Sequence, residues 1–405
     1  MPGTVWVAAG LALGPAVALG LARFAYALLL PAMRTDLGWS FATAGVMNTA
    51  NAVGYLAGAL LAAPLARRVG ARRLFLAAMA MTVLALLATA ATGNVVLLII
   101  LRLAAGISGA VVLIAGAGLT TQLNTSGRPG RAALLLGVYF AGGGVGIVLS
   151  GLVLPPLLAA SSAAAGWRWG WVLLAALSAI ATGISVPAVR AAAEPATPPA
   201  GGRGWPARRL AVLLVSYGLF GAGYIAYITF IVAFLKNAGA EAGEISVFWV
   251  LLGAAAIGAA FGWAPVLGRL RGGRGLATVL AVVALGALLP LLSDSAPAAY
   301  ASALLFGASF LAVVTASTAI ARRALPAHHW TQAIATLTVV FALGQCVGPV
   351  LAGALADSAT GIRAGLTVSV AILIAGTVLA LLQPHREPPT PTAPADGTPA
   401  PPQGK

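Results

Sequence analysis

Twelve apolar stretches, each long enough to cross a lipid bilayer as a helix, constrain what this sequence can fold into. A transmembrane helix needs about 20 mostly apolar residues. Charged residues make up 8% of the sequence, against about 25% in an ordinary soluble domain, so a soluble fold is excluded. We therefore predict an all-α membrane protein whose twelve transmembrane helices lie near residues 5–32, 41–66, 74–92, 95–120, 131–158, 169–187, 209–235, 244–267, 275–292, 297–321, 332–356 and 364–383.

The positive charges are distributed unevenly among the loops that connect these stretches. The chain carries 23 Lys and Arg against 8 Asp and Glu, a formal net charge of +15. With the N-terminus inside, 17 of the 23 cations fall in cytoplasmic loops or tails, which is the positive-inside pattern of membrane proteins. Both termini are thus predicted to be cytoplasmic. The excess charge is explained by the lipid bilayer and requires no nucleic-acid partner.

An internal repeat with an offset of about 201 residues divides the chain into two halves. Gly20–Tyr26 aligns with Gly221–Tyr227, which pairs Arg23 with Tyr224. Because six spans return the chain to the same side, the halves are parallel. Parallel halves enclose a central cavity near the midplane, and rocking exposes it to each side in turn. Further aligned positions are Pro64, Arg68 and Arg73 with Pro265, Arg269 and Arg274, Gly106 with Gly307, and, at an offset of 202, Gly142 and Gly146 with Gly344 and Gly348.

Segments poor in apolar residues mark the borders of these halves. Residues 1–187 form the predicted N-terminal six-helix half, and residues 209–383 form the C-terminal one. Residues 188–208 between them are rich in Pro, Gly and Ala and are predicted to be a cytoplasmic linker. Residues 384–405 are rich in proline, so we expect a disordered tail there.

Short motifs in three places resemble those of bacterial major facilitator superfamily transporters. They are Arg68, Gly70, Arg72 and Arg73 in the loop after the second stretch, Arg102 and Gly106 in the fourth stretch, and Gly20, Arg23, Phe24, Ala25, Tyr26 and Pro31 in the first. The last set is similar to the YbfB/YjiJ-like branch. The resemblance covers residues 5–383. It implies a secondary transporter of the bacterial inner membrane that works by alternating access, with spans 1, 4, 7 and 10 lining the cavity.

The sequence departs from the superfamily pattern in two places. In the loop after the second stretch, Arg67 stands where the family has an Asp, and Ala63 replaces its first Gly. The Gly-Pro motif familiar from span five of antiporters is better developed in span eleven, at Gly348-Pro349, whereas span five has Ile147 instead of the proline. The motifs therefore give only weak support to an antiporter.

Arg23 is the residue that says most about the substrate. It lies near the middle of the first stretch, where an arginine costs roughly 3 kcal/mol and persists only facing a cavity or a partner. No Asp or Glu lies near the middle of any stretch, so an internal ion pair is not expected. These observations favour the interpretation that Arg23 contacts an anionic substrate. The alternative is that it bonds a backbone carbonyl or a water molecule. Arg102, nearer the outer end of its stretch, is a second candidate for which a structural role is favoured.

Polar and aromatic residues at helical spacing complete the candidate substrate site. Those at helical spacing are Tyr26, Asn48, Asn51, Tyr55, Tyr224 and Tyr227, and two further candidates, Tyr139 and Gln345, lie on spans five and eleven. Each could bind the substrate or bond a neighbouring helix instead. Close helix packing and gating are predicted at Gly54, Gly58, Gly142, Gly146, Gly344, Gly348 and Pro349.

Three functions remain open at this point. The first is a secondary active or facilitative transporter of a small organic anion, a mono- or dicarboxylate. The second is an efflux transporter for amphipathic drugs or metabolites, and the third is a non-transporting receptor or scaffold. No Gly-Lys-Ser/Thr follows the glycine-rich runs, and no catalytic nucleophile–base pair or metal set is visible, so no ATP-driven pump, enzyme, metal or cofactor is expected.

The mode of coupling stays open as well, and a monomer is expected. Without a carboxylate near the midplane, the usual buried proton carrier is missing. Anion exchange, facilitated diffusion and proton symport through an acid at the outer rim are the alternatives. Asp36 and Asp357 are the nearest acids at span ends.

Overall fold

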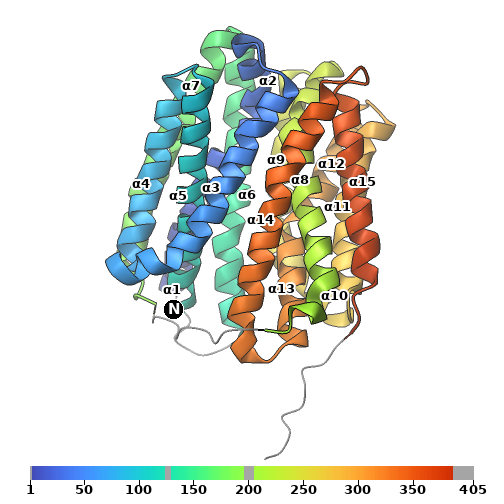
Figure 1. Ribbon diagram of the computed structural model, residues 1–405. Coiled ribbons are helices and arrows are strands. Elements are labelled where there is room, and N and C mark those ends of the chain that lie inside the picture. The colour runs from blue at the N-terminus through green and yellow to red at the C-terminus, as the bar shows by residue number, and fades with distance from the viewer. Residues whose placement is uncertain (1, 124–128, 196–204, 386–405) are drawn as a thin grey trace, which may run out of the picture.

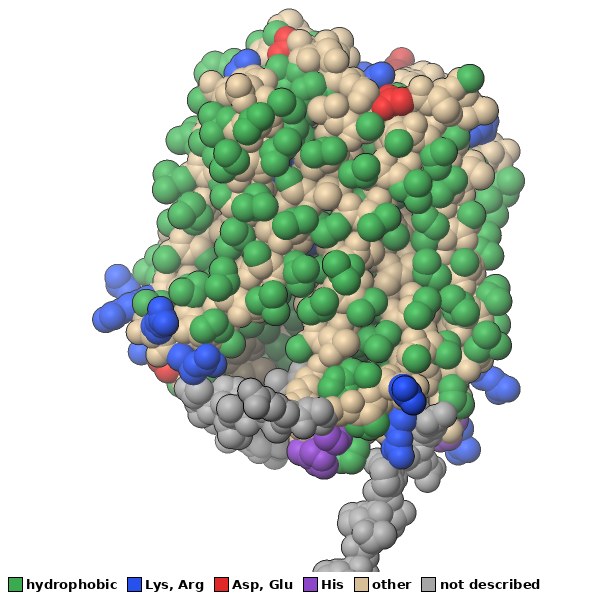
Figure 2. Space-filling model, viewed as in Figure 1, with side chains coloured by type: hydrophobic (Ala, Val, Ile, Leu, Met, Phe, Trp, Pro, Cys, Tyr) green, Lys and Arg blue, Asp and Glu red, His purple; other side chains and the backbone are tan. Residues whose placement is uncertain are grey.

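The computed structural model describes residues 2–123, 129–195 and 205–385, and all regular elements among them are helices (Figure 1). Twelve helical segments in this part of the chain are long and apolar enough to cross a membrane. The predicted all-α transmembrane fold is therefore confirmed. Hydrophobic side chains cover the middle of the face seen in Figure 2, and Lys and Arg lie toward its two ends. The predicted tail from residue 386 onward and residues 196–204 of the predicted linker lie outside the described residues.

Each predicted stretch corresponds to one span, and the first, seventh and tenth spans combine more than one element. The first half contains α1 (Pro2–Pro15), η1 (Ala16–Phe24), α2 (Tyr26–Leu37), α3 (Phe41–Val69), α4 (Ala71–Ala90), α5 (Val95–Thr121), α6 (Pro129–Ala159) and α7 (Ala163–Ala191). The second contains η2 (Ala207–Leu210), α8 (Ala211–Asn237), α9 (Ala242–Gly262), α10 (Ala264–Arg269), α11 (Arg274–Leu292), α12 (Ala296–Phe310), α13 (Ala312–Ala324), η3 (Ala327–His329), α14 (Trp330–Ala356) and α15 (Ile362–Leu381).

Several helices end at other residues than the apolar stretches do. The second stretch was expected to end at 66, but α3 continues through two arginines to Val69. It stops at Gly70, whose φ of 85° is a conformation that glycine adopts without strain. The eighth stretch was expected to reach 267, but α9 ends at Gly262 because Pro265 begins the separate helix α10. Hydropathy thus locates the membrane core of a helix and not its cap.

The first span contains a π-helical segment, η1, that was not predicted. The N–H of Ala25 donates to the carbonyl of Gly20, five residues back, at 3.0 Å. Arg23 lies in the last turn of this segment. Wider turns of this kind occur often at functional sites, because they turn side chains away from their α-helical positions. The span that carries the main site candidate is therefore locally irregular.

The glycines predicted to pack helices lie where two backbones approach closely. A Cβ on Gly142 or Gly146 would overlap the carbonyl oxygen of Ala12 or Ala16, in the first span. This contact lets α6 pack directly on the helix that carries Arg23. The same arrangement holds Gly344 and Gly348 of α14 against Gly218 and Ala222 of α8, and Gly54 and Gly58 of α3 against Leu103 and Ile107 of α5.

These contacts also correct the register of the internal repeat. The packing glycines of α6 and α14 are offset by 202 residues (Gly344 minus Gly142), as the sequence indicated. Their partners in the first and seventh spans are offset by 206 (Gly218 minus Ala12). The alignment of Gly20–Tyr26 with Gly221–Tyr227, at an offset of 201, therefore matches a sequence motif but does not match the residues that pack in equivalent places. Tyr224 is not the spatial counterpart of Arg23, and the two residues have to be placed from their own contacts.

The two halves meet along α6 and α9 and along α3 and α14, and the contacts of α3 with α14 lie toward the end of the bundle opposite the N-terminus (upper end of Figure 1). We call this the distal end, and the end that carries the N-terminus and Gln383 the proximal end. A Cβ on Gly45 would overlap the carbonyl oxygen of Pro349, so the helices touch backbone to backbone. Further along, the Thr49 hydroxyl donates to the carbonyl of Cys346 at 2.7 Å. Together these contacts form the distal seam.

Asp357, at the C-terminus of α14, caps a helix of the other half. Its two carboxylate oxygens accept the N–H groups of Phe41 and Ala42, both at 2.8 Å. The hydroxyl of Ser40 accepts the next N–H, from Thr43, at 3.1 Å. The first turn of α3, whose N–H groups have no partner within the helix, is thus satisfied largely from the opposite half. This cap links the two halves at the distal seam.

We expect the Asp357→Ala variant to spend a larger fraction of time in conformations whose distal seam is open. Loss of a side-chain cap costs about 0.5–2 kcal/mol, which corresponds to a several-fold change in population. The measurement is the rate of Cys346 labelling by a membrane-impermeant maleimide, because this cysteine is the only one in the chain and lies in the seam. Asp294→Ala is the matched control, since Asp294 pairs with Arg363 within one half, at 3.6 Å. Equal labelling rates in both variants would argue against the cap.

Candidate functional site

Arg23 lies between the two halves and is bonded to a neutral side chain. Its Nη2 donates to Oε1 of Gln345 on α14 at 2.6 Å, and Nε2 of Gln345 donates to the Tyr224 hydroxyl on α8 at 2.6 Å. The exposed fractions are 4% for Arg23, 0% for Gln345 and 4% for Tyr224. Three of the residues predicted for the substrate site thus form one buried hydrogen-bonded chain across the interface of the halves.

The guanidinium group of Arg23 has fewer partners than it can bind. Among the described residues, Nε has no hydrogen-bond acceptor, and no Asp or Glu forms an ion pair with this arginine. The Tyr55 ring lies beside it, with the guanidinium carbon 5.1 Å from the ring centroid. An aromatic face attracts a cation but leaves the charge uncompensated. Arg23 therefore carries a buried positive charge without a counter-ion among the described residues, and the same holds for Arg102, whose Nε and Nη2 also have no acceptor there.

Stacked aromatic rings border this chain of hydrogen bonds. The ring of Tyr224 lies 4.8 Å from that of Phe220 and 5.6 Å from that of Phe341, with nearly parallel planes. Tyr217 extends the stack, 4.9 Å from Phe341. The two phenylalanines were not predicted as site residues. The signal for Phe220 is its spacing with Tyr217 and Tyr224 on one face of the seventh span, whereas Phe341 lies on α14 and has no such signal.

Arg102 lies next to the irregular segment but binds backbone. Its Nη1 donates to the carbonyl of Ala22 at 2.8 Å, and its guanidinium faces the rings of Tyr26 at 4.8 Å and Trp171 at 5.6 Å. The Asn51 amide donates to the backbone carbonyl of Arg102 at 3.1 Å. Arg102, Tyr26 and Asn51 are therefore placed to support the turn that carries Arg23. They do not reach the chain that runs to Tyr224.

The remaining candidates are engaged elsewhere. The Asn48 amide donates to the Thr229 hydroxyl across the interface of the halves. The Tyr139 hydroxyl bonds the carbonyls of Val112 and Leu113, both at 3.1 Å, and the Tyr227 hydroxyl bonds Ser302 at 2.5 Å. These partners match the alternative that each residue bonds a neighbouring helix. The Asn48 carbonyl oxygen is the exception, because no donor among the described residues reaches it.

The buried polar groups around Arg23 are mostly hydrogen-bond donors. The described residues contain no cluster of His, Cys, Asp or Glu that could hold a metal. Their buried polar side chains include two arginines, amides and hydroxyls, but no carboxylate. Such groups can donate hydrogen bonds to an acceptor without exchanging protons with it.

Comparison with known sequences identifies the family. The sequence model of a family described as "Uncharacterised MFS-type transporter YbfB" matches residues 15–381. The chain belongs to this family. The match runs from within the first span to the end of the twelfth and confirms the resemblance seen in the motifs. No curated protein matches the sequence.

Solved transporters share the fold of this MFS-type protein. One is a bacterial homologue of the human lysosomal transporter Spinster in an inward-facing, unoccupied conformation. It has a TM-score of 0.71 and 15% sequence identity, over 94% of this chain and 97% of that one. Another is the nucleoside transporter NupG, with a TM-score of 0.68 and 13% identity, over 94% and 97% of the two chains. At these identities the likeness concerns the fold alone.

Proposed function

We propose that this protein is a secondary transporter of a small organic anion of the mono- or dicarboxylate class. The observation that carries the proposal is Arg23, a buried arginine whose bonded partner is an amide and not a carboxylate. A buried charge without a counter-ion is costly in a membrane. An anion bound there would offset that cost. Since the chain belongs to a family of transporters, we take this anion to be the cargo.

In the proposed bound state a carboxylate takes the place of the Gln345 amide at the guanidinium group of Arg23. An arginine binds a carboxylate through two parallel hydrogen bonds, and Nε of Arg23 is free for one of them. The Gln345 amide and the Tyr224 hydroxyl can turn their donors to the same anion. Because Arg23 belongs to the first half and the other two residues to the second, the anion would join the halves. Such a contact can couple binding to rocking.

The transport cycle proposed here needs no buried carboxylate. Asp36 accepts a hydrogen bond from the Trp167 indole N–H at 2.8 Å, and Asp357 caps α3. Both acids thus have structural partners, which favours anion exchange or facilitated diffusion over proton symport. We place the protein in the bacterial inner membrane as a monomer with the proximal end in the cytoplasm, as the cation distribution predicts.

Efflux of amphipathic compounds is the second candidate function. The stacked rings of Tyr217, Phe220, Tyr224 and Phe341 favour a ligand with a flat apolar part. The two functions differ in what Arg23 contributes. It binds the cargo in the first, whereas in the second its hydrogen bond to Gln345 serves the structure.

A ligand-stabilisation screen of the detergent-solubilised protein tests the proposal. A ligand present at 100 times its Kd stabilises the native state by about 2.7 kcal/mol and raises the melting temperature. We expect small carboxylates, aliphatic or aromatic, to raise it, and the corresponding amides and alcohols, of the same shape, to leave it unchanged. Stabilisation by the neutral compounds and not by the carboxylates would contradict anion transport and support efflux.

A further inference from the structure

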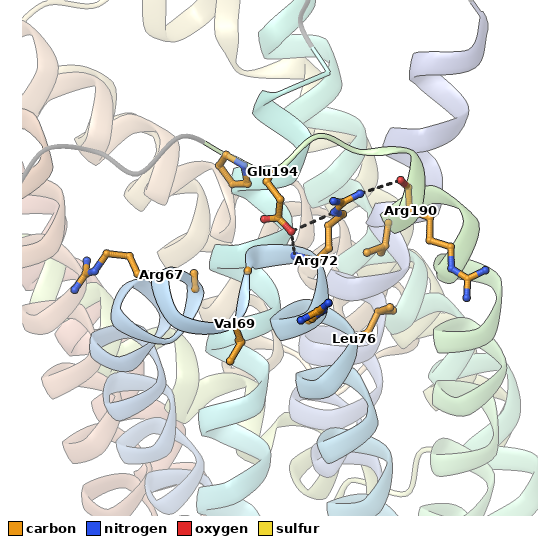
Figure 3. Close-up of a pocket in the computed structure, with 11 residues that line it drawn as sticks. Arg67, Val69, Arg72, Leu76, Arg190 and Glu194 are labelled. Carbon is orange, nitrogen blue, oxygen red and sulfur yellow. Dashed lines mark hydrogen bonds and ion pairs between the residues drawn. The ribbon is translucent and has the colours of Figure 1, made fainter.

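A pocket lined by arginines lies at the proximal end of the first half, away from the site between the halves (Figure 3). It has a volume of about 550 Å³ and is formed by the end of α3, the start of α4, the end of α7 and the chain that follows α7. We call it the basic pocket. The loop motif seen in the sequence contributes Gly70, Arg72 and Arg73 to it. Nothing in the proposed transport of an anion uses this pocket.

The basic pocket carries more positive than negative charge. Four arginines line it, Arg67, Arg72, Arg73 and Arg190, against the single carboxylate of Glu194. Glu194 pairs with Arg72 at 3.1 Å. The guanidinium groups of the other three form no ion pair with any acid in the described part of the chain. Arg67 and Arg190 lie on opposite sides of the Arg72–Glu194 pair (Figure 3).

Glu194 shows which chemistry the pocket accepts. Its carboxylate takes hydrogen bonds from the backbone N–H groups of Ala71 at 2.8 Å and Arg72 at 3.2 Å, and from Nε of Arg72 at 3.1 Å. Burial by itself would raise the pKa of Glu194, but these hydrogen bonds and the charge of Arg72 outweigh it and lower the pKa. The pocket therefore already holds one anion of the chain itself and keeps it ionised.

The pocket also lies at the level of the membrane surface. Arg67 and Arg190 lie in the last turns of the candidate spans α3 and α7, Arg72 and Arg73 lie in the first turn of α4, and Val69 and Leu76 add apolar side chains to the pocket wall. Clusters of arginine at this depth attract anionic lipids, whose phosphates lie in the headgroup layer. A guanidinium group binds a phosphate through paired hydrogen bonds in the same way as a carboxylate.

We propose that the basic pocket binds the phosphate of an anionic lipid headgroup beside Glu194. The three unpaired arginines supply the binding charge, and the apolar wall accommodates the start of the acyl chains. A bound lipid would hold the turn between α3 and α4 against the chain that leaves α7 toward the second half.

The test measures binding of phosphatidylglycerol to the full chain in detergent, by native mass spectrometry and by the melting temperature, with phosphatidylcholine as the uncharged comparison. Changing three arginines together, Arg67→Gln, Arg73→Gln and Arg190→Gln, should weaken binding of phosphatidylglycerol at least about tenfold. The matched control is Arg269→Gln, Arg271→Gln and Arg274→Gln, which removes the same charge after the eighth span. We expect that control to retain most of the binding.

The Glu194→Gln variant provides an independent test, in which the affinity for the lipid should rise. It removes the negative charge that repels the lipid phosphate, so phosphatidylglycerol should bind more tightly, an outcome that damage to the fold does not produce. Equal losses in the two triple variants, or equal binding of phosphatidylcholine, would overturn the proposal. The proposal would also be overturned if inorganic phosphate stabilised the protein as strongly as the lipid does, because the pocket would then be a site for a soluble phosphate.

Discussion

Arg23→Ala should lower the affinity for the transported anion by about 30-fold or more, because loss of a charge-assisted contact in a desolvated site costs about 2–5 kcal/mol. The variant removes the positive charge of the hydrogen-bonded chain that runs to Gln345 and Tyr224. Folding should survive, since alanine removes a charge that is expensive to insert in the membrane. The measurement is the Kd of the best carboxylate from the screen, together with the melting temperature without ligand.

Arg23→Lys separates the charge from the geometry. Lysine keeps the positive charge but lacks the planar fork that binds two carboxylate oxygens at once. We expect an affinity between those of the wild type and Arg23→Ala, with a similar dependence on salt. A well-folded Arg23→Ala protein that binds the anion as tightly as the wild type would refute anion transport through this site.

Much of the fold could be predicted from the sequence, because in a membrane every span must be a helix of about the same length. Hydropathy alone located all twelve spans. The ends of the helices were predicted less well, because the residues that end or interrupt them, such as Gly70 and Pro265, do not change the mean hydropathy of a stretch. The π-helical segment at Arg23 was not predicted, because the i to i+5 bonds leave no periodic signal in so short a stretch.

The candidate site was predicted in its residues but not in its contacts. Composition and depth identified Arg23, helical spacing identified Tyr224, and Gln345 was named as a polar residue of span eleven. That Gln345 bridges the other two could not be predicted, since it is separated from Arg23 by 322 positions. The repeat suggested that Arg23 and Tyr224 are counterparts at an offset of 201, whereas the packing contacts of these two spans are offset by 206, a difference of five residues. Contacts between distant spans depend on the rotation of each helix, which sequence spacing within one span does not fix.

Gly146→Ala and Gly348→Ala should each destabilise the protein, by about 1–3 kcal/mol, although alanine is the better helix former. A Cβ at Gly146 would overlap the carbonyl oxygen of Ala16, and one at Gly348 that of Ala222. In both cases the overlapping atom belongs to a backbone, so a whole helix has to shift. At Gly146 the shift displaces the π-helical segment that carries Arg23, and we therefore expect weaker anion binding there in addition to a lower melting temperature.

Gly183→Ala is the matched control, because Gly183 also lies inside a membrane-spanning helix but a Cβ there would meet no atom within 4 Å. Replacing a glycine in a helix interior by alanine gains roughly 0.5–1 kcal/mol when nothing is in the way. The control should therefore melt at the wild-type temperature or above it, while the other two variants melt below it. If all three variants were equally stable, the close backbone contacts of α6 and α14 would not be what holds the two halves in shape.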